Sequence, residues 1–193
     1  MSGQPEKMGV FFDRVAEKYD DVHKTLVYDD PEAFYAKVAE PMAPTGNVVQ
    51  ILDLGIGTGL QLDAVFDRVP NAHITGIDLA GEMLKLLREK FADKLSQITL
   101  IQDSYLNPLP DVAFDYCISV MTMHHLLEAK KLAVYKSIFN ALKPGGKYIE
   151  GDYIVSAEVS AKEKTAYEAA AGDDSTILDG FYHIDLPMTA KEV

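Results

Sequence analysis

Residues 47–60 read Asn-Val-Val-Gln-Ile-Leu-Asp-Leu-Gly-Ile-Gly-Thr-Gly-Leu. Their first part, 48–54, is an almost unbroken apolar run, which is typical of a strand buried on both faces of a parallel sheet. Gly55, Gly57 and Gly59 then end the run at alternate positions. Because glycine has no Cβ, such a loop admits positive φ angles and lets a ligand lie against the backbone, beside the free amides of a following helix. The stretch therefore predicts a strand, a ligand-binding loop and a helix.

The spacing of the glycines narrows the class of ligand. A dinucleotide fingerprint has the form G-x-G-x-x-G, and a phosphate-binding Walker A loop needs Gly-Lys-Ser or Gly-Lys-Thr. Here the glycines occupy every second position, and an acid, Asp53, precedes the first of them by two residues. A glycine-rich turn without a ligand is the alternative, although three glycines weaken a loop unless a ligand must approach the backbone closely.

The rest of the chain repeats the alternation of strand and helix. Short apolar runs predict further strands at 73–78, 98–102, 114–120 and 147–155. Amphipathic patterns predict helices at 60–69, 80–94 and 131–142. Strands joined by crossover helices form a doubly wound α/β sheet that is mostly parallel, with helices on both faces and the ligand over the carboxyl ends of the strands. We therefore expect a Rossmann-like fold.

Helices are also predicted on either side of the sheet region. Two precede it, one over 8–19 and one that begins at Asp30-Pro31. The alanine-rich stretch 160–171 predicts another helix, and 172–180 predicts an exposed loop. Thr189 is expected to cap one further helix that the sequence does not complete.

Composition limits the partners. The 193 residues carry a formal net charge of −12, and no basic patch offsets this charge, so nucleic-acid phosphates and anionic lipid would be repelled. No apolar run approaches the about 18 residues of a membrane span, and the first residues lack a signal-peptide core. The single cysteine, Cys117, excludes an internal disulfide and a zinc cluster and is expected in the core. We expect a cytoplasmic protein with a small-molecule ligand.

Polar residues follow the second and third predicted strands. Asp78 ends the second strand, where a carboxylate can accept both hydroxyls of a ribose. The same acid would suit NAD, or would cap the following helix. The third strand ends in Gln102-Asp103-Ser104, where an acid beside an exposed amide can read the amino edge of an adenine while Leu79 packs on its face. The strand ends therefore predict an adenosine site.

Five features, in this order, resemble the class I S-adenosylmethionine (SAM) methyltransferases over about residues 45–155. They are Asp53-Leu-Gly55-Ile-Gly57-Thr-Gly59, Gly76-Ile-Asp78, Gln102-Asp103-Ser104, Phe114-Asp-Tyr-Cys-Ile-Ser119 and Leu142-Lys-Pro-Gly-Gly146. The resemblance implies SAM as cofactor, S-adenosylhomocysteine as product and methyl transfer to a small molecule. It places the glycine loop under the methionine part of SAM, Asp78 on the ribose, and the third strand end at the adenine. The residues expected to bind the cofactor are Tyr19, Asp53, Gly55, Gly57, Gly59, Asp78, Leu79, Asp103, Ser104, Ser119, Val120 and Met121.

The resemblance also implies how the chain is organised. Residues 1–44 would form an N-terminal helical lid in which Tyr19 touches the SAM carboxylate, although Tyr19 equally completes the apolar stripe of its helix. Residues 45–155 would form the SAM-binding core, and 156–193 a helical and loop segment on the substrate side. The family's sheet closes with an antiparallel hairpin that this sequence does not supply. The fifth strand is therefore expected to carry an unpaired edge, open to self-association.

Methyl transfer requires alignment and exclusion of water more than a catalytic residue, because the sulfonium is already activated. After the fourth strand come His124 and His125, either of which could take a proton from the acceptor near neutral pH. Adjacent residues on one strand cannot both face the cleft, and packing at a helix start is their alternative role. No metal site is predicted, since no further Cys or His lies at ligand spacing.

Residues of the fifth strand and the C-terminal segment are candidates for the acceptor cavity. They are Glu150 and Asp152, followed by Tyr148, Tyr153, Tyr182 and His183. Two other functions remain open. A non-catalytic SAM-binding sensor or partner subunit would use the same loop, so the cofactor motifs do not separate it from an enzyme. An NAD-dependent oxidoreductase is opposed by the glycine spacing.

Overall fold

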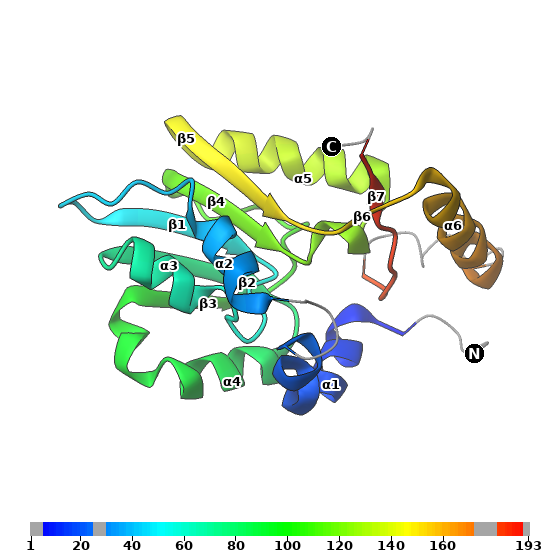
Figure 1. Cartoon of the computed structure of the whole chain (residues 1–193), viewed down its shortest axis with the longest axis horizontal. Coiled ribbons are helices and arrows are strands. Elements are labelled where there is room, and N and C mark those ends of the chain that lie inside the picture. Colours follow the sequence, from blue (N-terminus) through cyan, green and yellow to red (C-terminus); the bar gives the residue numbers. More distant parts are fainter. Residues whose placement is uncertain (1–5, 25–29, 172–180, 191–193) are drawn as a thin grey trace.

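A five-stranded parallel sheet forms the centre of the computed structural model, which describes residues 6–24, 30–171 and 181–190 (Figure 1). The strand order is β3-β2-β1-β4-β5, and every neighbouring pair is parallel. The predicted Rossmann-like class is therefore confirmed. The order reverses between β1 and β4, and ligands of such sheets bind at the carboxyl ends of the strands at this point. The strands are β1 (Val49–Leu54), β2 (Ala72–Asp78), β3 (Ile98–Gln102), β4 (Phe114–Val120) and β5 (Leu142–Gly151).

Helices cover both faces of the sheet. α3 (Leu62–Arg68) and α4 (Gly81–Lys90) lie on one face and α5 (Glu128–Ala141) on the other (Figure 1). The side chains of β1 alternate between two apolar clusters, because Ile51 packs in the cluster of α3 and α4 and Leu52 in that of α5. Burial on both faces explains why these strands are continuous apolar runs in the sequence. Cys117 is buried in the second cluster, as expected of a core residue.

The two N-terminal helices form as predicted, as α1 (Met8–Val22) and α2 (Pro31–Ala39). The Asp30 side chain caps α2 by accepting a hydrogen bond from the Ala33 amide at 3.0 Å. α1 lies at the carboxyl ends of the strands and packs on α4 through Ala16 (Figure 1). Just before α1, Lys7 forms an antiparallel bridge with Tyr182 of the C-terminal segment. α1 thus contacts both the core and the C-terminal segment, over the expected ligand edge.

The predicted fifth strand is divided in two. β5 ends at Gly151, and β6 (Ile154–Val155) pairs in parallel with β7 (Met188–Thr189). The strand breaks at Asp152, whose carboxylate accepts hydrogen bonds from the backbone N–H groups of His124 and Tyr153. Thr189 pairs with Val155, so the predicted helix cap at Thr189 is wrong. The helix predicted at 160–171 is present as α6 (Ala157–Ala171).

β5 is the outermost strand on its side of the sheet, and the described residues supply no hairpin beside it. Self-association through this edge stays a prediction. The loop predicted at 172–180 lies outside the described residues. Within the described ranges, no helix is both long and apolar enough to cross a membrane.

Candidate functional site

The glycine loop after β1 adopts the backbone that its sequence requires. Gly55, Gly57 and Gly59 have φ angles of 70°, 55° and 73°, in the left-handed region. The surroundings of the three differ. A Cβ on Gly55 would lie 2.6 Å from the Thr122 hydroxyl, and one on Gly59 would lie 3.0 Å from Leu62. A Cβ on Gly57 would have no neighbour closer than 4.0 Å, so Gly57 alone faces open space.

Asp78, at the end of β2, holds this loop in place by a hydrogen bond. Its carboxylate accepts hydrogen bonds from the Gly57 amide at 2.8 Å and from the Ala80 amide at 2.9 Å. Burial raises the pKa of Asp78, and the two backbone donors partly oppose that rise. Ala80 is the residue that precedes α4, and no side chain of the described residues caps the first turn of that helix, so the alternative role of Asp78 as a helix cap is wrong. Asp78 lines the pocket over the loop.

Half of the residues expected to bind the cofactor line the pocket over the loop. Val120 lines a neighbouring pocket together with Gly55 and Gly57. Phe12, Tyr105 and Thr122 also line the pocket over the loop and were not foreseen. Tyr105 lies three residues after the end of β3, and this position was the only feature of the sequence that could have identified it as a pocket residue. The expected residues that line the pocket are Tyr19, Gly55, Gly57, Asp78, Leu79 and Met121.

Other expected cofactor residues lie away from this pocket. The Asp103 carboxylate accepts hydrogen bonds from the Ser104 amide and the Asn107 side chain, both at 2.7 Å, in a local turn. Ser104 is buried, and its hydroxyl accepts from the Leu106 amide. Ser119 directs its hydroxyl to Tyr148, 2.6 Å away. These three side chains are occupied by protein partners in this conformation.

Asp53 lies beneath the loop and is fully buried. Its Oδ2 accepts a hydrogen bond from Gln61 Nε2 at 2.6 Å, whereas its Oδ1 has no hydrogen-bond partner among the described residues. Burial raises the pKa of Asp53 to about 7, and the nearby Asp78 adds to the rise. An unpartnered buried carboxylate oxygen is costly and is completed best by a cationic or N–H group of a ligand.

These observations fit SAM. Gly57 leaves open space above the loop, Asp78 presents a carboxylate at the end of β2, and Asp53 has a buried oxygen that lacks a donor. The pocket itself holds only about 40 Å³, far below the roughly 300 Å³ of ordinary small-molecule pockets. Its outer wall is α1, which contributes Met8, Phe12 and Tyr19. α1 therefore covers the pocket over the loop.

A much larger cavity of about 1000 Å³ adjoins the loop pocket. Met121 lies between the two and lines both. Its φ angle of 51° is in the left-handed region, which side chains other than glycine rarely adopt, and strain of this kind gathers at functional sites. The Met121 amide holds this turn by donating to the Gly151 carbonyl at 2.7 Å. The cavity walls include Phe11, Phe12, Tyr19, Phe34, His124, His125, Asp152, Tyr153, His183 and Asp185.

Both candidate catalytic histidines line this cavity. The expectation that only one could face it is wrong, because Met123–His125 forms a 3-10 turn and not a strand. Successive side chains on a 3-10 turn are about 120° apart, so two neighbours can face one space. The ring centroids of His124 and His125 lie 4.0 Å apart.

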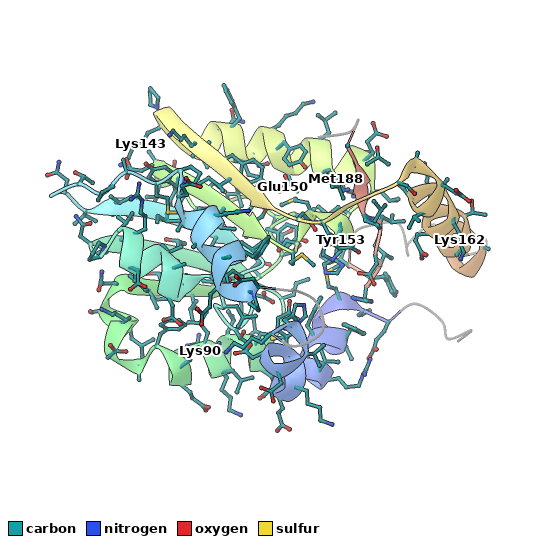
Figure 2. The ribbon with its side chains drawn as sticks, viewed as in Figure 1. Lys90, Lys143, Glu150, Tyr153, Lys162 and Met188 are labelled. Carbon is teal, nitrogen blue, oxygen red and sulfur yellow. The ribbon has the colours of Figure 1, made fainter. Side chains whose placement is uncertain are left out.

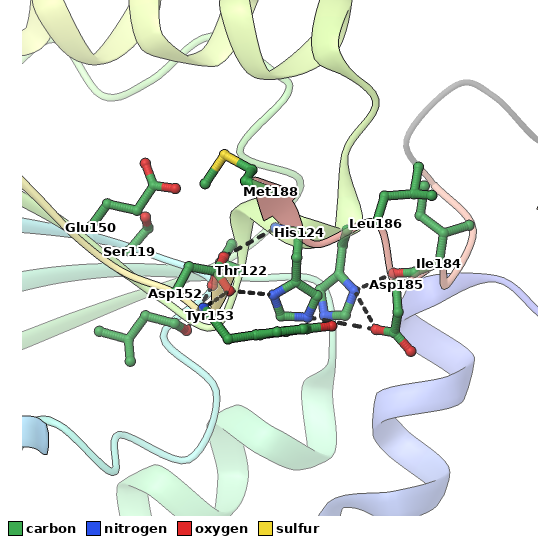
Figure 3. A network of polar contacts seen from close by, with 12 residues as sticks. Ser119, Thr122, His124, Glu150, Asp152, Tyr153, Ile184, Asp185, Leu186 and Met188 are labelled. Atoms are coloured by element: carbon green, nitrogen blue, oxygen red, sulfur yellow. Dashed lines mark hydrogen bonds and ion pairs between the residues drawn. The ribbon is translucent and has the colours of Figure 1, made fainter. Parts of the chain in front are cut away.

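The two rings have different hydrogen-bond partners (Figure 3). His124 Nδ1 donates to the Asp152 carboxylate at 2.8 Å, and its Nε2 lies 3.6 Å from Asp185 Oδ1. His125 Nδ1 donates to the Ile184 carbonyl at 2.5 Å. Burial lowers the pKa of His125 well below its ordinary value, and His124 beside it adds to the effect. His124 therefore keeps a nitrogen toward the cavity, whereas His125 is held neutral by its surroundings.

The acceptor-side candidates divide between two places. Asp152, Tyr153 and His183 line the large cavity. Glu150 and Tyr148 instead line a groove of about 340 Å³ beside α5 (Figure 2). Asp185, which approaches both histidines, was not foreseen, because nothing local in the sequence ties it to residues sixty positions earlier.

Comparison with known proteins agrees with this geometry. A family model described as a methyltransferase domain matches residues 51–146. A methyltransferase of Anoxybacillus flavithermus is 30% identical over 165 residues, which cover 82% of this chain and 70% of the relative. A ubiquinone/menaquinone biosynthesis C-methyltransferase of Geotalea daltonii is 28% identical, over 75% of this chain and 62% of its own length.

Solved structures share the fold. The DhpI–SAM–HEP complex aligns with a TM-score of 0.65 and 18% identity, over 95% of this chain and 82% of that one. A SAM-dependent methyltransferase from Clostridium acetobutylicum aligns with a TM-score of 0.60 and 18% identity, over 78% of this chain and 61% of that one. The Anoxybacillus relative, the matched methyltransferase domain, the glycine loop and the sheet order together lead to one conclusion: the chain belongs to the class I SAM-dependent methyltransferases, a family of enzymes.

Proposed function

We propose that this enzyme methylates a small molecule bound in the large cavity beside Met121. The main support for this proposal is that the loop pocket and the large cavity adjoin and share lining residues. Phe12, Tyr19, Met121 and His125 line both, so a cofactor on the glycine loop and an acceptor in the cavity would meet there. A volume of about 1000 Å³ lies at the upper end of small-molecule pockets. The net charge of −12 further disfavours a nucleic-acid acceptor.

Methyl transfer from SAM requires the protein mainly to align the two reactants. Bound SAM supplies a methyl group on a positively charged sulfur, which an acceptor attacks in line with the S–CH₃ bond. The aromatic walls align the acceptor and exclude water. His124, with its Nδ1–H held by Asp152, presents Nε2 to the cavity and takes the acceptor's proton. We favour His124 over His125 for this role, because the Asp152 carboxylate on His124 Nδ1 stabilises the protonated ring, whereas burial lowers the pKa of His125.

The names of similar proteins include methyltransferases of different acceptor atoms. Their names include a phosphoethanolamine N-methyltransferase of Caenorhabditis elegans, of which this chain spans 22%, and a malonyl-[acyl-carrier protein] O-methyltransferase of a Marinomonas species, of which it spans 47%. Nitrogen and oxygen acceptors are thus both found among similar proteins. A proton acceptor such as His124 would help most with a hydroxyl, whose proton must leave as the new bond forms.

We further propose that α1 is the lid of this site, within an N-terminal part that spans 1–44 and covers the SAM-binding core of 45–155. Asp20 near the end of α1 accepts a hydrogen bond from Thr58 of the glycine loop and pairs with Lys90 of α4, each at 2.5 Å (Figure 2). Asp13 accepts from the Glu82 amide at the start of α4. These contacts hold α1 closed over the loop pocket, and the C-terminal segment, expected over 156–193, contributes His183 and Asp185 to the cavity wall.

The proposal is tested by methyl-label transfer from SAM into a metabolite extract, with release of S-adenosylhomocysteine measured in parallel. We expect label in at least one small molecule with the wild-type chain and none with Gly57→Val. Label that appears only in protein or nucleic acid would contradict the small-molecule acceptor. Absence of label together with tight SAM binding would favour a non-catalytic SAM-binding role.

His124→Asn is expected to lower the rate of methyl transfer by a factor of about 10² to 10⁴, the usual contribution of a positioned acid or base. Asparagine keeps a donor toward Asp152 but has no nitrogen at the Nε2 position. SAM affinity, measured by calorimetric titration, is expected to stay within about twofold. The same replacement at His73, which is exposed on β2, is the matched control. A His124→Asn enzyme with the wild-type rate would assign the ring to packing alone.

A further inference from the structure

Asp185 stands among three histidines on one wall of the acceptor cavity. Its Oδ1 lies 3.5 Å from His125 Nδ1, 3.6 Å from His124 Nε2 and 3.9 Å from His183 Nε2. These separations are too long for hydrogen bonds. They are close to the about 3.4 Å between two ligands of one tetrahedral cation whose bonds are about 2.0 to 2.1 Å long. Asp185 Oδ1 and a ring nitrogen of either His124 or His125 are therefore spaced like two ligands of one ion.

We infer that His124, His125 and Asp185 bind a divalent transition-metal ion (Figure 3). One ligand atom from each residue lies within 4.8 Å of the others. Two imidazole nitrogens and one carboxylate oxygen suit Zn²⁺, Co²⁺ or Fe²⁺ better than Mg²⁺ or Ca²⁺, which prefer oxygen ligands alone. Sequence spacing gave no sign of this set, because Asp185 comes from the C-terminal segment.

Hydrogen bonds from neighbouring groups hold the proposed ligands in place, as they do in known metal sites. Asp152 is buried and holds His124 Nδ1 at 2.8 Å, which orients Nε2 toward Asp185. The Leu186 amide donates to the His124 carbonyl at 2.7 Å and holds the segment of Asp185 against the histidine turn. His125 Nδ1 now donates to the Ile184 carbonyl, so an ion that binds this nitrogen would have to displace its proton.

This inference rests on the proposed function for its consequence. If His124 Nε2 takes the acceptor's proton, the same nitrogen cannot at that moment hold a metal ion. A bound Zn²⁺ would also occupy the space beside Met121 where the acceptor is expected. We therefore expect divalent transition-metal ions to inhibit methyl transfer in competition with the acceptor, without changing the affinity for SAM.

The binding test uses the full chain stripped of metal by a chelator and then titrated with Co²⁺ and Zn²⁺. We expect near-stoichiometric binding, a visible Co²⁺ spectrum of tetrahedral type, and its loss when Zn²⁺ is added. Asp185→Asn is expected to weaken binding by at least about tenfold, and Asp152→Asn by about 10- to 100-fold, because His124 loses the carboxylate that orients its ring. Asp111→Asn, at an exposed acid outside the cavity, is the matched control.

The outcomes separate this inference from the proposed function. Wild-type protein that takes up no Co²⁺ or Zn²⁺ overturns the metal site, and label transfer by the metal-free enzyme still supports the proposed function. Equal binding by Asp185→Asn also overturns the site. Stimulation by Zn²⁺ in place of inhibition would overturn the competition at His124. Binding that depends on Asp185, with inhibition reversed by chelator, supports both parts.

Discussion

Gly57→Val is expected to abolish SAM binding while the protein stays folded. A Cβ at this position meets nothing closer than 4.0 Å, so the branched side chain enters the open space over the loop where the cofactor would lie. The φ angle of 55° adds backbone strain of about 1 to 3 kcal/mol, which a domain of this size can absorb. Calorimetric titration should show no detectable SAM binding, and the melting temperature should fall by roughly 2 to 12 °C.

Gly55→Val is the matched variant, with the same φ sign and a different neighbourhood. Its Cβ would lie 2.6 Å from Thr122 Oγ1 and 2.8 Å from Thr122 Cγ2, a clash that comes in addition to the strain of a φ of 70°. We expect this variant to lose more stability than Gly57→Val, because overpacking alone costs about 1 to 3 kcal/mol. A Gly57→Val protein that binds SAM with wild-type affinity, or that is the less stable of the two, would contradict the close approach of the cofactor.

Local patterns predicted the centre of the fold closely. The strands expected at 98–102 and 114–120 are β3 and β4 with the same bounds, and the glycine loop has the positive φ angles that its composition demanded. These features depend on apolar side chains that are buried on both faces of β4 and partly buried in β3, and on the absence of a Cβ in the loop. Both are properties of a few adjacent residues. Sequence therefore carries them without knowledge of the rest of the chain.

Contacts between residues that are far apart in the sequence could not be predicted from local patterns. Thr189 had the signature of a helix cap, yet pairing with β6 took precedence over its local preference. His124 and His125 were expected on a strand, where one of them would face away, and the 3-10 turn after Met121 gives both to one cavity. Asp185 reaches them because the C-terminal segment is hydrogen-bonded to that turn, by the Leu186 amide at the His124 carbonyl and by the Ile184 carbonyl at His125 Nδ1.

The buried carboxylate of Asp53 is expected to cost stability in the absence of a cofactor and to serve cofactor binding. Burial of an acid costs free energy, because the ionised form loses its hydration. Fully buried acids are therefore found mainly at functional sites. Asp53 has one good hydrogen bond, from Gln61, and one oxygen without a donor among the described residues. The loop above it is the floor on which the cofactor would rest. The carboxylate thus costs stability in the cofactor-free protein, and a bound cation or N–H donor would recover that cost.

Asp53→Asn is therefore expected to raise stability at pH 8 and to weaken SAM binding in the same protein. Folding raises the pKa of this acid from 3.8 to about 7, so the folded state binds the proton more tightly than the unfolded chain. The stability that this acid contributes is present below pH 4 and is lost as the pH rises to about 7, at a total cost of roughly 4 kcal/mol. Asparagine cannot ionise and escapes that loss, although its buried amide nitrogen lacks a partner at a cost of about 1 to 3 kcal/mol.

The measurement is the difference in melting temperature between Asp53→Asn and the wild type from pH 5 to pH 8. We expect this difference to rise with pH and to favour the variant by roughly 2 to 12 °C at pH 8, which corresponds to a net gain of about 1 to 3 kcal/mol. SAM affinity at pH 8 should fall about tenfold or more, because a charge-assisted contact is lost. Asp67→Asn, at an exposed acid of α3, should change neither quantity. A difference that does not vary with pH would show that Asp53 is already ionised at no cost, and an unchanged SAM affinity would show that its unpartnered oxygen does not serve the cofactor.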